Sequence, residues 1–226
     1  MPTSGTDDDV LVVLRPRVDP MLRRALSRSF ELGFLGSMPI EAQIDHALGF
    51  VSVVETRLGG PPSSVIDLGT GGGVPGLILG SCWPEARVVL MDASERRTQF
   101  LAETLDEWPA SGGIDVVRGR AEELGHLGGF REQFDAVTSR SFGIPALTAE
   151  CGSSFLVPGG WMVVSEPPDA APELRWPAAG LVLVGLEPVE TTRVAGRFGY
   201  QVLRKVGPIE DRFPRRVGIP AKRPIF

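Results

Sequence analysis

The 226-residue chain contains only two cysteines and two histidines. Cys82 and Cys151 lack the short spacing of metal ligands, and His46 and His126 do not complete such a set. We therefore expect no metal site and two reduced cysteines in packing positions. No apolar run approaches the roughly 20 residues of a membrane span, and the first ten residues carry three aspartates where a secretory signal is basic and apolar. These absences predict a soluble, cytoplasmic protein without membrane contact.

Excess basic charge is also lacking, since the net charge is −5. This balance argues against a simple basic nucleic-acid-binding protein. The charge is unevenly distributed, however. Residues 193–226 carry nine Lys or Arg and two acids, whereas the preceding 192 residues carry 14 basic and 26 acidic residues. We interpret the C-terminal segment as a basic unit suited to phosphate, with folding against the protein's own acidic surface as the alternative.

The chain divides at about residue 59. Residues 1–20, with several Asp and Pro, predict a loosely held start. The apolar spacing over 21–58 predicts amphipathic helices broken near 33–39. We therefore expect a flexible start and helical preface over residues 1–58, followed by one cofactor-binding domain over residues 59–226 that ends in the basic segment.

From residue 64 onward, strand and helix patterns alternate, which predicts a mostly parallel sheet with crossover helices. The expected strands cover 64–67, 88–91, 114–118, 134–138, 160–165, 181–187 and 199–206, and the expected helices include 95–108 and 145–155. The last two strands are close enough to form an antiparallel hairpin through residues 191–196. The predicted fold is α/β and Rossmann-like, with about seven strands.

A glycine-rich stretch marks a candidate ligand site. The first strand runs into Asp67-Leu-Gly-Thr-Gly-Gly-Gly73 and then into a helix. Glycine tolerates positive φ and close backbone approach, so a ligand can lie against main-chain amides. In open α/β sheets this turn lies at the carboxyl ends of the strands, where ligands bind. Asp92 ends the second strand, where its carboxylate can accept hydrogen bonds from ribose hydroxyls, so the pair predicts an adenosine-containing ligand.

Two details favour S-adenosylmethionine (SAM) over a nicotinamide dinucleotide. An acid precedes the glycines, and their spacing departs from G-x-G-x-x-G, with no helix N-terminus clearly free for a pyrophosphate. We therefore predict SAM as the cofactor. Asp67 has the alternative role of capping local backbone groups. The candidate cofactor-binding residues are Asp67, Gly69, Thr70, Gly71, Gly73 and Asp92, together with Ala121 and Glu122 beside the adenine and Arg140 after the fourth strand.

Arg140 and Phe142 follow the fourth strand, where a methyl acceptor must approach the sulfonium. Arg140 is the candidate catalytic residue, because its planar guanidinium can hold a phosphate or a base edge. Phe142 can stack on a base of the substrate. The alternatives are a structural ion pair for Arg140 and core packing for Phe142.

Three stretches resemble the bacterial small-subunit ribosomal RNA guanine-N7 methyltransferase family, also called the glucose-inhibited division protein B family. They cover residues 67–76, 134–142 and 213–225. The chain departs from the family's Lys-Gly pair after the fifth strand, where it reads Val164-Ser-Glu-Pro-Pro168, and we interpret Ser165 to Pro168 as a rigid loop. The resemblance implies a class I SAM-dependent methyltransferase fold, SAM binding at the glycine turn, and substrate contact by Arg140, Arg212, Arg215, Arg216, Lys222 and Arg223.

The predicted function is methyl transfer from SAM to N7 of a guanine in small-subunit ribosomal RNA, with that RNA or the small ribosomal subunit as partner. Guanine N7 has a free lone pair at neutral pH, so no general base is required. This suits a site with no histidine beside Arg140, and we expect both histidines in surface or packing positions. The alternatives are a small-molecule methyltransferase, a non-catalytic SAM-binding protein and a nicotinamide enzyme.

Overall fold

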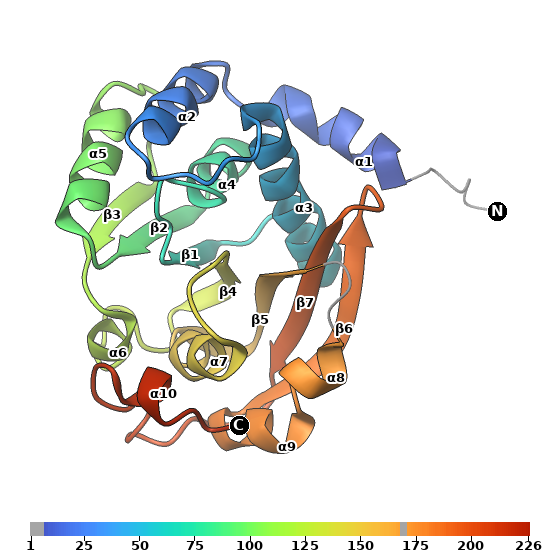
Figure 1. Cartoon of the computed structure of the whole chain (residues 1–226), viewed down its shortest axis with the longest axis vertical. Coiled ribbons are helices and arrows are strands. Elements are labelled where there is room, and N and C mark those ends of the chain that lie inside the picture. The colour runs from blue at the N-terminus through green and yellow to red at the C-terminus, as the bar shows by residue number, and fades with distance from the viewer. Residues whose placement is uncertain (1–6, 168–170) are drawn as a thin grey trace.

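A seven-stranded sheet divides the molecule (Figure 1). The computed structural model describes residues 7–167 and 171–226. The sheet order is β3-β2-β1-β4-β5-β7-β6; the first five strands run parallel, and β7 is antiparallel to both β5 and β6. The strands are β1 (Ser64–Leu68), β2 (Arg87–Asp92), β3 (Ile114–Arg118), β4 (Phe134–Ser139), β5 (Leu156–Glu166), β6 (Leu186–Val194) and β7 (Phe198–Lys205).

Helices cover both faces of the sheet. The helices α1 to α5 lie on one side, and α6, α7, α9 and α10 lie on the other (Figure 1). They are α1 (Asp7–Leu14), α2 (Met21–Glu31), α3 (Ile40–Leu58), α4 (Gly76–Cys82), α5 (Glu95–Asp106), α6 (Ala121–Leu124), α7 (Pro145–Ser153), α8 (Pro172–Arg175), α9 (Ala178–Leu181) and α10 (Ile219–Lys222), with 3-10 turns at Arg15–Arg17 and Val182–Val184.

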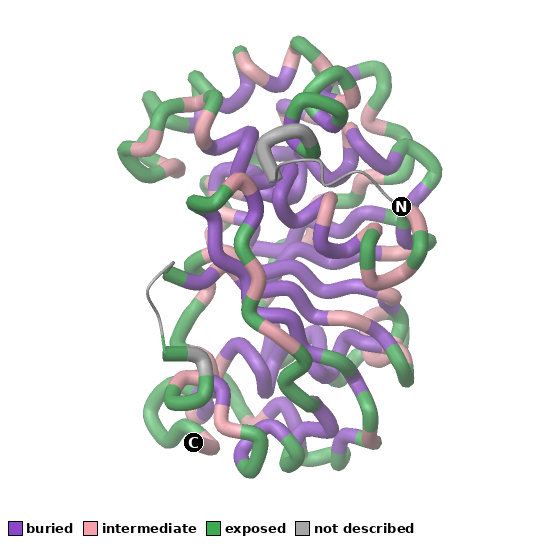
Figure 2. Tube along the Cα trace, turned by 90° about the vertical axis from the view of Figure 1, so that its right-hand side faces the viewer, coloured by how far each residue is buried: buried purple, intermediate pink, exposed green. Residues whose placement is uncertain are grey.

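The core follows from the alternation of side chains along the buried strands. Val65 packs against the α1 to α5 layer, whereas its neighbour Ile66 packs against the α6 and α7 layer. Buried residues therefore run through the central strands, and exposed residues gather in the outer layers (Figure 2). The mostly parallel seven-stranded sheet with helices on both faces confirms the predicted α/β, Rossmann-like fold. Within the described residues, no helix is long and apolar enough to cross a membrane.

The beginning of the chain differs from the expectation of a loosely held start. Residues 7–17 form α1 and a 3-10 turn, and Leu11, Leu14 and Val18 are buried. Arg15 donates two hydrogen bonds to the carboxylate of Asp45 on α3, at 2.9 and 2.8 Å. The apolar stripe and this ion pair fix the segment to α3, and residues 1–6 lie outside the described residues.

Three element boundaries on the β6 side were predicted wrongly. Leu181 ends α9 and the next three residues form a 3-10 turn, because a short apolar run suits a buried helix as well as a strand. The hairpin turn is limited to 195–197, since β6 extends to Val194. Ser165, which ended the expected strand and began the expected loop, belongs to β5 and pairs with β7. Glu166, expected in the loop, also belongs to β5, and Pro168 is outside the described residues.

Candidate cofactor and acceptor site

The glycine turn after β1 is shaped by close packing. Gly69 has a φ of 63°, and a Cβ placed on it would lie 2.7 Å from Cδ2 of Phe142. A Cβ on Gly72 would lie 2.1 Å from Oγ of Ser29, whose hydroxyl donates to the Gly72 carbonyl at 3.0 Å. The turn is thus pressed between α2 and the loop after β4, and only glycine fits at both positions.

Asp67 lies beneath the turn. Its Oδ2 accepts the Gly76 backbone N–H at 3.0 Å, and its Oδ1 accepts the Thr138 hydroxyl at 2.9 Å. Burial raises the pKa of Asp67 to about 6. The residue lines none of the three cavities described below. These contacts favour the capping role for Asp67, which ties the start of α4 to β1 and β4.

Asp92 is placed at the carboxyl end of β2, facing the turn. Its Oδ2 accepts the Gly71 backbone N–H at 3.0 Å, and its Oδ1 accepts the Ser94 backbone N–H at 2.8 Å. Arg97 lies 3.5 Å from Oδ2. A carboxylate has about four lone-pair sites, so acceptor capacity remains for ribose hydroxyls.

The first cavity, of about 290 Å³, contains the predicted adenosine-binding residues. Its walls come from the glycine turn, the end of β2, the start of α6, the loop after β4 and the C-terminal segment. The lining residues include Gly69, Asp92, Ala121, Glu122, Phe142, Val217, Gly218 and Ala221. The structure therefore brings together five residues that the sequence pattern had singled out, and it adds three from the tail.

The second cavity, of about 150 Å³, adjoins the first at Gly69. Thr70 and Gly71 line it, together with Arg97, Arg140 and Ser141. Arg140 Nη1 is buried and has no hydrogen-bond partner among the described residues. Burial lowers the pKa of this guanidinium. An unpaired guanidinium N–H in a small polar cavity fits a carboxylate, and the larger cavity fits a nucleoside, so the two joined cavities fit the two ends of SAM.

The third cavity, of about 470 Å³, lies beyond the ends of β4 and β5. It shares Phe142 with the first cavity and Ser141 with the second. Phe142 therefore lies between the first and third cavities, whereas Arg140 lines the second cavity alone, next to Ser141, which the second and third cavities share. Phe142 packs against Gly69 and also borders two cavities, so its core and site roles coincide.

His46 also lines the third cavity, which corrects the expectation of a site without a histidine near Arg140. It stacks on Phe198 with ring centroids 5.0 Å apart, and its Nε2 lies 3.0 Å from Oγ of Ser165. Burial, with a smaller contribution from the charge of Arg140, lowers the pKa of His46 to about 3. The imidazole is therefore neutral and a weak base at physiological pH.

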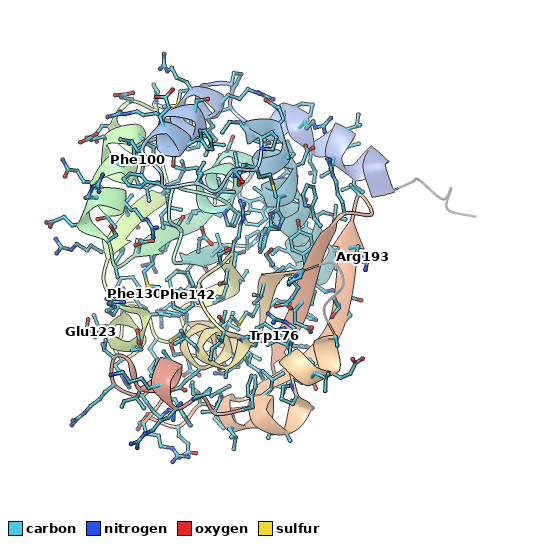
Figure 3. All side chains as sticks on the ribbon, in the orientation of Figure 1. Phe100, Glu123, Phe130, Phe142, Trp176 and Arg193 are labelled. Carbon is cyan, nitrogen blue, oxygen red and sulfur yellow. The ribbon has the colours of Figure 1, made fainter. Side chains whose placement is uncertain are left out.

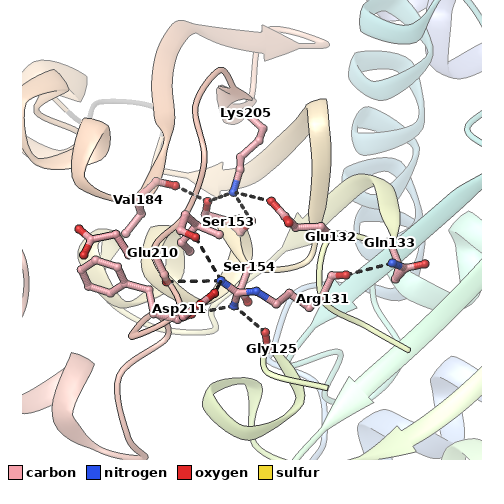
Figure 4. A network of polar contacts seen from close by, with 12 residues as sticks. Gly125, Arg131, Glu132, Gln133, Ser153, Ser154, Val184, Lys205, Glu210 and Asp211 are labelled. Carbon is pink, nitrogen blue, oxygen red and sulfur yellow. Dashed lines mark hydrogen bonds and ion pairs between the residues drawn. The ribbon is translucent and has the colours of Figure 1, made fainter. Parts of the chain in front are cut away.

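The C-terminal segment forms a wall of the first cavity, which sequence reasoning missed. The Gly218 backbone N–H donates to Oε1 of Glu122 at 3.1 Å. Arg131 holds the preceding stretch by donating to the carbonyls of Phe213 and Ile209, at 2.8 and 3.2 Å. Figure 4 shows the same guanidinium between Gly125 and Glu210, whose carbonyls it also contacts. His126 contacts the Pro214 carbonyl at 2.7 Å. The proline-glycine pattern of the tail was the available signal for such a fixed conformation.

The five basic residues predicted to contact RNA in the C-terminal tail, residues 206–226, divide into two groups. Arg215 contacts Glu150 through its guanidinium, and Arg212 contacts Glu210 at 3.0 Å. For these two, the alternative of pairing with the protein's own acids holds. Arg216, Lys222 and Arg223, hereafter the tail cations, are exposed. They follow or flank the residues that wall the first cavity, as the RNA-contact prediction requires.

Comparison with known proteins gives one family and one fold. The family model described as rRNA small subunit methyltransferase G matches residues 40–193. The chain is similar to ribosomal RNA small subunit methyltransferase G of Leuconostoc mesenteroides, 32% identical over 77% of this chain and 74% of that one. That of Roseiflexus castenholzii is 36% identical over 74% and 73%.

Solved structures support the fold. An O-methyltransferase from Bacillus cereus in complex with SAH covers 89% of this chain and 100% of its own, with a TM-score of 0.60 and 14% identity. The O-methyltransferase TomG from Streptomyces achromogenes in complex with SAM covers 84% and 91%, with a TM-score of 0.57 and 17% identity. At these identities the likeness establishes the shared fold alone.

Proposed function

Because the chain belongs to the rRNA small subunit methyltransferase G family, we propose that it transfers a methyl group from SAM to N7 of a guanine in small-subunit ribosomal RNA. The observation that carries the proposal is the meeting of three cavities at the glycine turn, Ser141 and Phe142. Two of them fit the ends of SAM, and the third is open to an acceptor. A SAM-binding protein without catalysis has no need of the third cavity, and the family disfavours a small-molecule acceptor.

The chain's own residues supply position and shielding. SAM, when bound, provides an electrophilic methyl group on a positively charged sulfur. Asp92 holds the ribose, the Ala121 and Glu122 segment borders the adenine, and Arg140 pairs with the carboxylate of the amino-acid end. Phe142 borders both the first and the third cavity, so it would shield the junction between SAM and an acceptor from water when both are bound.

No residue has to remove a proton from guanine N7. The neutral His46, with its pKa near 3, would be a poor base, and this is compatible with an acceptor that already has a free lone pair. The tail cations are exposed beside the first cavity and are proposed to contact RNA phosphates. The small ribosomal subunit, in which this RNA is folded, is the proposed partner.

The first test is calorimetric titration with SAM and, separately, with NAD. Asp92→Ala is expected to weaken SAM binding about 10- to 100-fold, the usual range for a lost hydrogen bond to a charged group. Asp115→Ala, an exposed acid on the neighbouring strand β3, is the matched control and retains wild-type affinity. Failure of the wild-type protein to bind SAM would refute the cofactor assignment.

The second test is transfer of labelled methyl to small subunits that lack the guanine-N7 mark, and to the RNA extracted from them. The expected product is 7-methylguanine in the small-subunit RNA. Comparison of particle and free RNA identifies which one is the substrate. SAM binding without label in either substrate would contradict the RNA assignment and leave the cofactor assignment intact.

A further inference from the structure

The third cavity contains buried polar atoms that the fold leaves unpaired. Oγ of Ser139 and Nδ1 of His46 have no hydrogen-bond partner among the described residues, and neither does Nε1 of Trp176. All three residues are buried and line this cavity. A buried polar group without a hydrogen-bond partner destabilises the folded chain. These residues give the walls of the cavity polar groups in addition to apolar ones, which suits an occupant that has hydrogen-bonding groups of its own.

Three large aromatic side chains are part of the wall of the same cavity. Phe142 comes from the loop after β4, Phe198 from the start of β7, and Trp176 from the segment between α8 and α9. Figure 3 shows how Phe142 and Trp176 lie on different elements around the ends of the central strands. Unpaired bases of RNA are bound by stacking on such side chains and by hydrogen bonds to their edges. The cavity therefore has the chemistry of a nucleobase site.

The carboxylate of Glu166 is buried at the carboxyl end of β5. The Glu166 side chain is 3% exposed, and Arg175 donates to both of its oxygens, at 2.5 Å from Nε and 3.2 Å from Nη2. One lone pair on each oxygen remains available. In the sheet, Val164 pairs with Ser139. Glu166 and Ser141 each lie two residues beyond this pair. They therefore belong to neighbouring segments of the chain, and both segments border the cavity.

Two adjacent acceptor oxygens match one nucleobase. Guanine offers two neighbouring donors on its Watson–Crick edge, N1–H and the N2 amino group. Adenine and cytosine each place a ring-nitrogen acceptor beside their amino group, and uracil has a single donor there. The donor edge of guanine lies across the ring system from N7, so a guanine held by this edge can present N7 in the opposite direction.

We propose that the third cavity receives the acceptor guanine, unstacked from the RNA, and that Glu166 binds its N1–H and N2 amino group. The N7 atom then faces the junction at Ser141 and Phe142. Arg175 is a positioning residue that orients the carboxylate through its two hydrogen bonds. This assignment rests on the proposed function and adds to it the residue that selects guanine.

The test uses RNA in which the mapped acceptor guanosine is replaced by inosine, which keeps N7 and N1–H and lacks the N2 amino group. The wild-type kcat/KM is expected to fall about 10- to 100-fold on the inosine substrate, because one hydrogen bond to the carboxylate is lost. The kcat/KM of Glu166→Gln on guanosine RNA is expected to be lower than that of the wild type by a similar factor. The ratio of its kcat/KM values on guanosine and inosine RNA is expected to be much closer to one. Glu187→Gln, at an exposed position of β6, is the matched control and behaves as wild type.

SAM affinity, measured by calorimetry, is expected to be unchanged in Glu166→Gln, which separates acceptor selection from a folding defect. An unchanged guanosine-to-inosine ratio in Glu166→Gln would overturn the proposal. If that variant does not fold, the test relies on the wild-type protein alone. Equal kcat/KM values of the wild type on guanosine and inosine RNA would then overturn the proposal. If the wild-type protein methylates no guanine in the RNA, the proposed function is refuted, and the assignment of Glu166 is refuted with it.

Discussion

Arg215→Ala is expected to lower the free energy of unfolding by about 3–5 kcal/mol, the usual cost of leaving one member of a buried ion pair without its partner. Glu150 on α7 is 0% exposed, whereas the Arg215 side chain is 26% exposed. The carboxylate accepts the Arg215 backbone N–H at 2.8 Å and three guanidinium contacts of 2.6 to 3.2 Å. After the substitution only the backbone contact remains, so a buried charge loses most of its compensation.

The assay is urea unfolding followed by circular dichroism. Arg216→Ala is the control, because this neighbouring residue is exposed and its loss is expected to change stability by less than about 0.5 kcal/mol. The Arg215 variant is also expected to bind SAM more weakly, since Val217 and Gly218 wall the first cavity just beyond the lost anchor. Equal stability of the two variants would refute the reasoning that this ion pair fixes the tail.

Three further predictions concern the turn, the tail and a buried lysine. Gly69→Ala is expected to weaken SAM binding at least tenfold by calorimetry, since its Cβ would meet Phe142, whereas Gly60→Ala, with open space around it, retains wild-type affinity; equal affinities would contradict the packing argument. Alanine at all three tail cations is expected to lower the slope of log affinity for RNA against log salt by about 2 to 3; an unchanged slope would place the phosphate contacts elsewhere. Burial lowers the pKa of Lys205 from 10.5 to about 8, so between these pH values the unfolded chain holds a proton that the folded chain has released, and stability rises with pH. Urea unfolding of wild type relative to Lys205→Met is expected to show this rise, and a pH-independent difference would contradict it.

The parts of the fold that the sequence predicted are those determined by local patterns. The alternation of apolar strands with helices gave the parallel sheet, and the turn after β1 with Asp92 predicted the edge of the sheet at which the cofactor binds. Residues 181–184 were assigned to a strand because a short apolar run is compatible with either element, and tertiary packing decides between them. Gly185, with a φ of 70°, ends the helical segment before β6 begins.

The parts of the site that local patterns missed depend on contacts distant in sequence. Gly218 meets Glu122 across 96 positions, so nothing near either residue indicates that the tail walls the cofactor cavity. His46 reaches the acceptor side through Ser165, 119 positions away. Glu166 was placed in a loop because two prolines follow it, yet its pairing with Gly199 extends the strand to that residue. Each case is a pairing between elements that only the folded chain brings together.

The net charge of −5 does not conflict with an RNA substrate, because a polyanion responds to local charge. Charges beyond about 10 Å are largely screened at physiological salt. On α3, acids such as Asp45 and Glu55 are already paired with Arg15 and Arg17. The cavities, by contrast, are bordered by Arg97 and Arg120 and flanked by the tail cations. Asp92, Glu122 and Glu166 also line the cavities, but five arginines line them as well, so an RNA strand that approaches the cavities meets a local excess of cations.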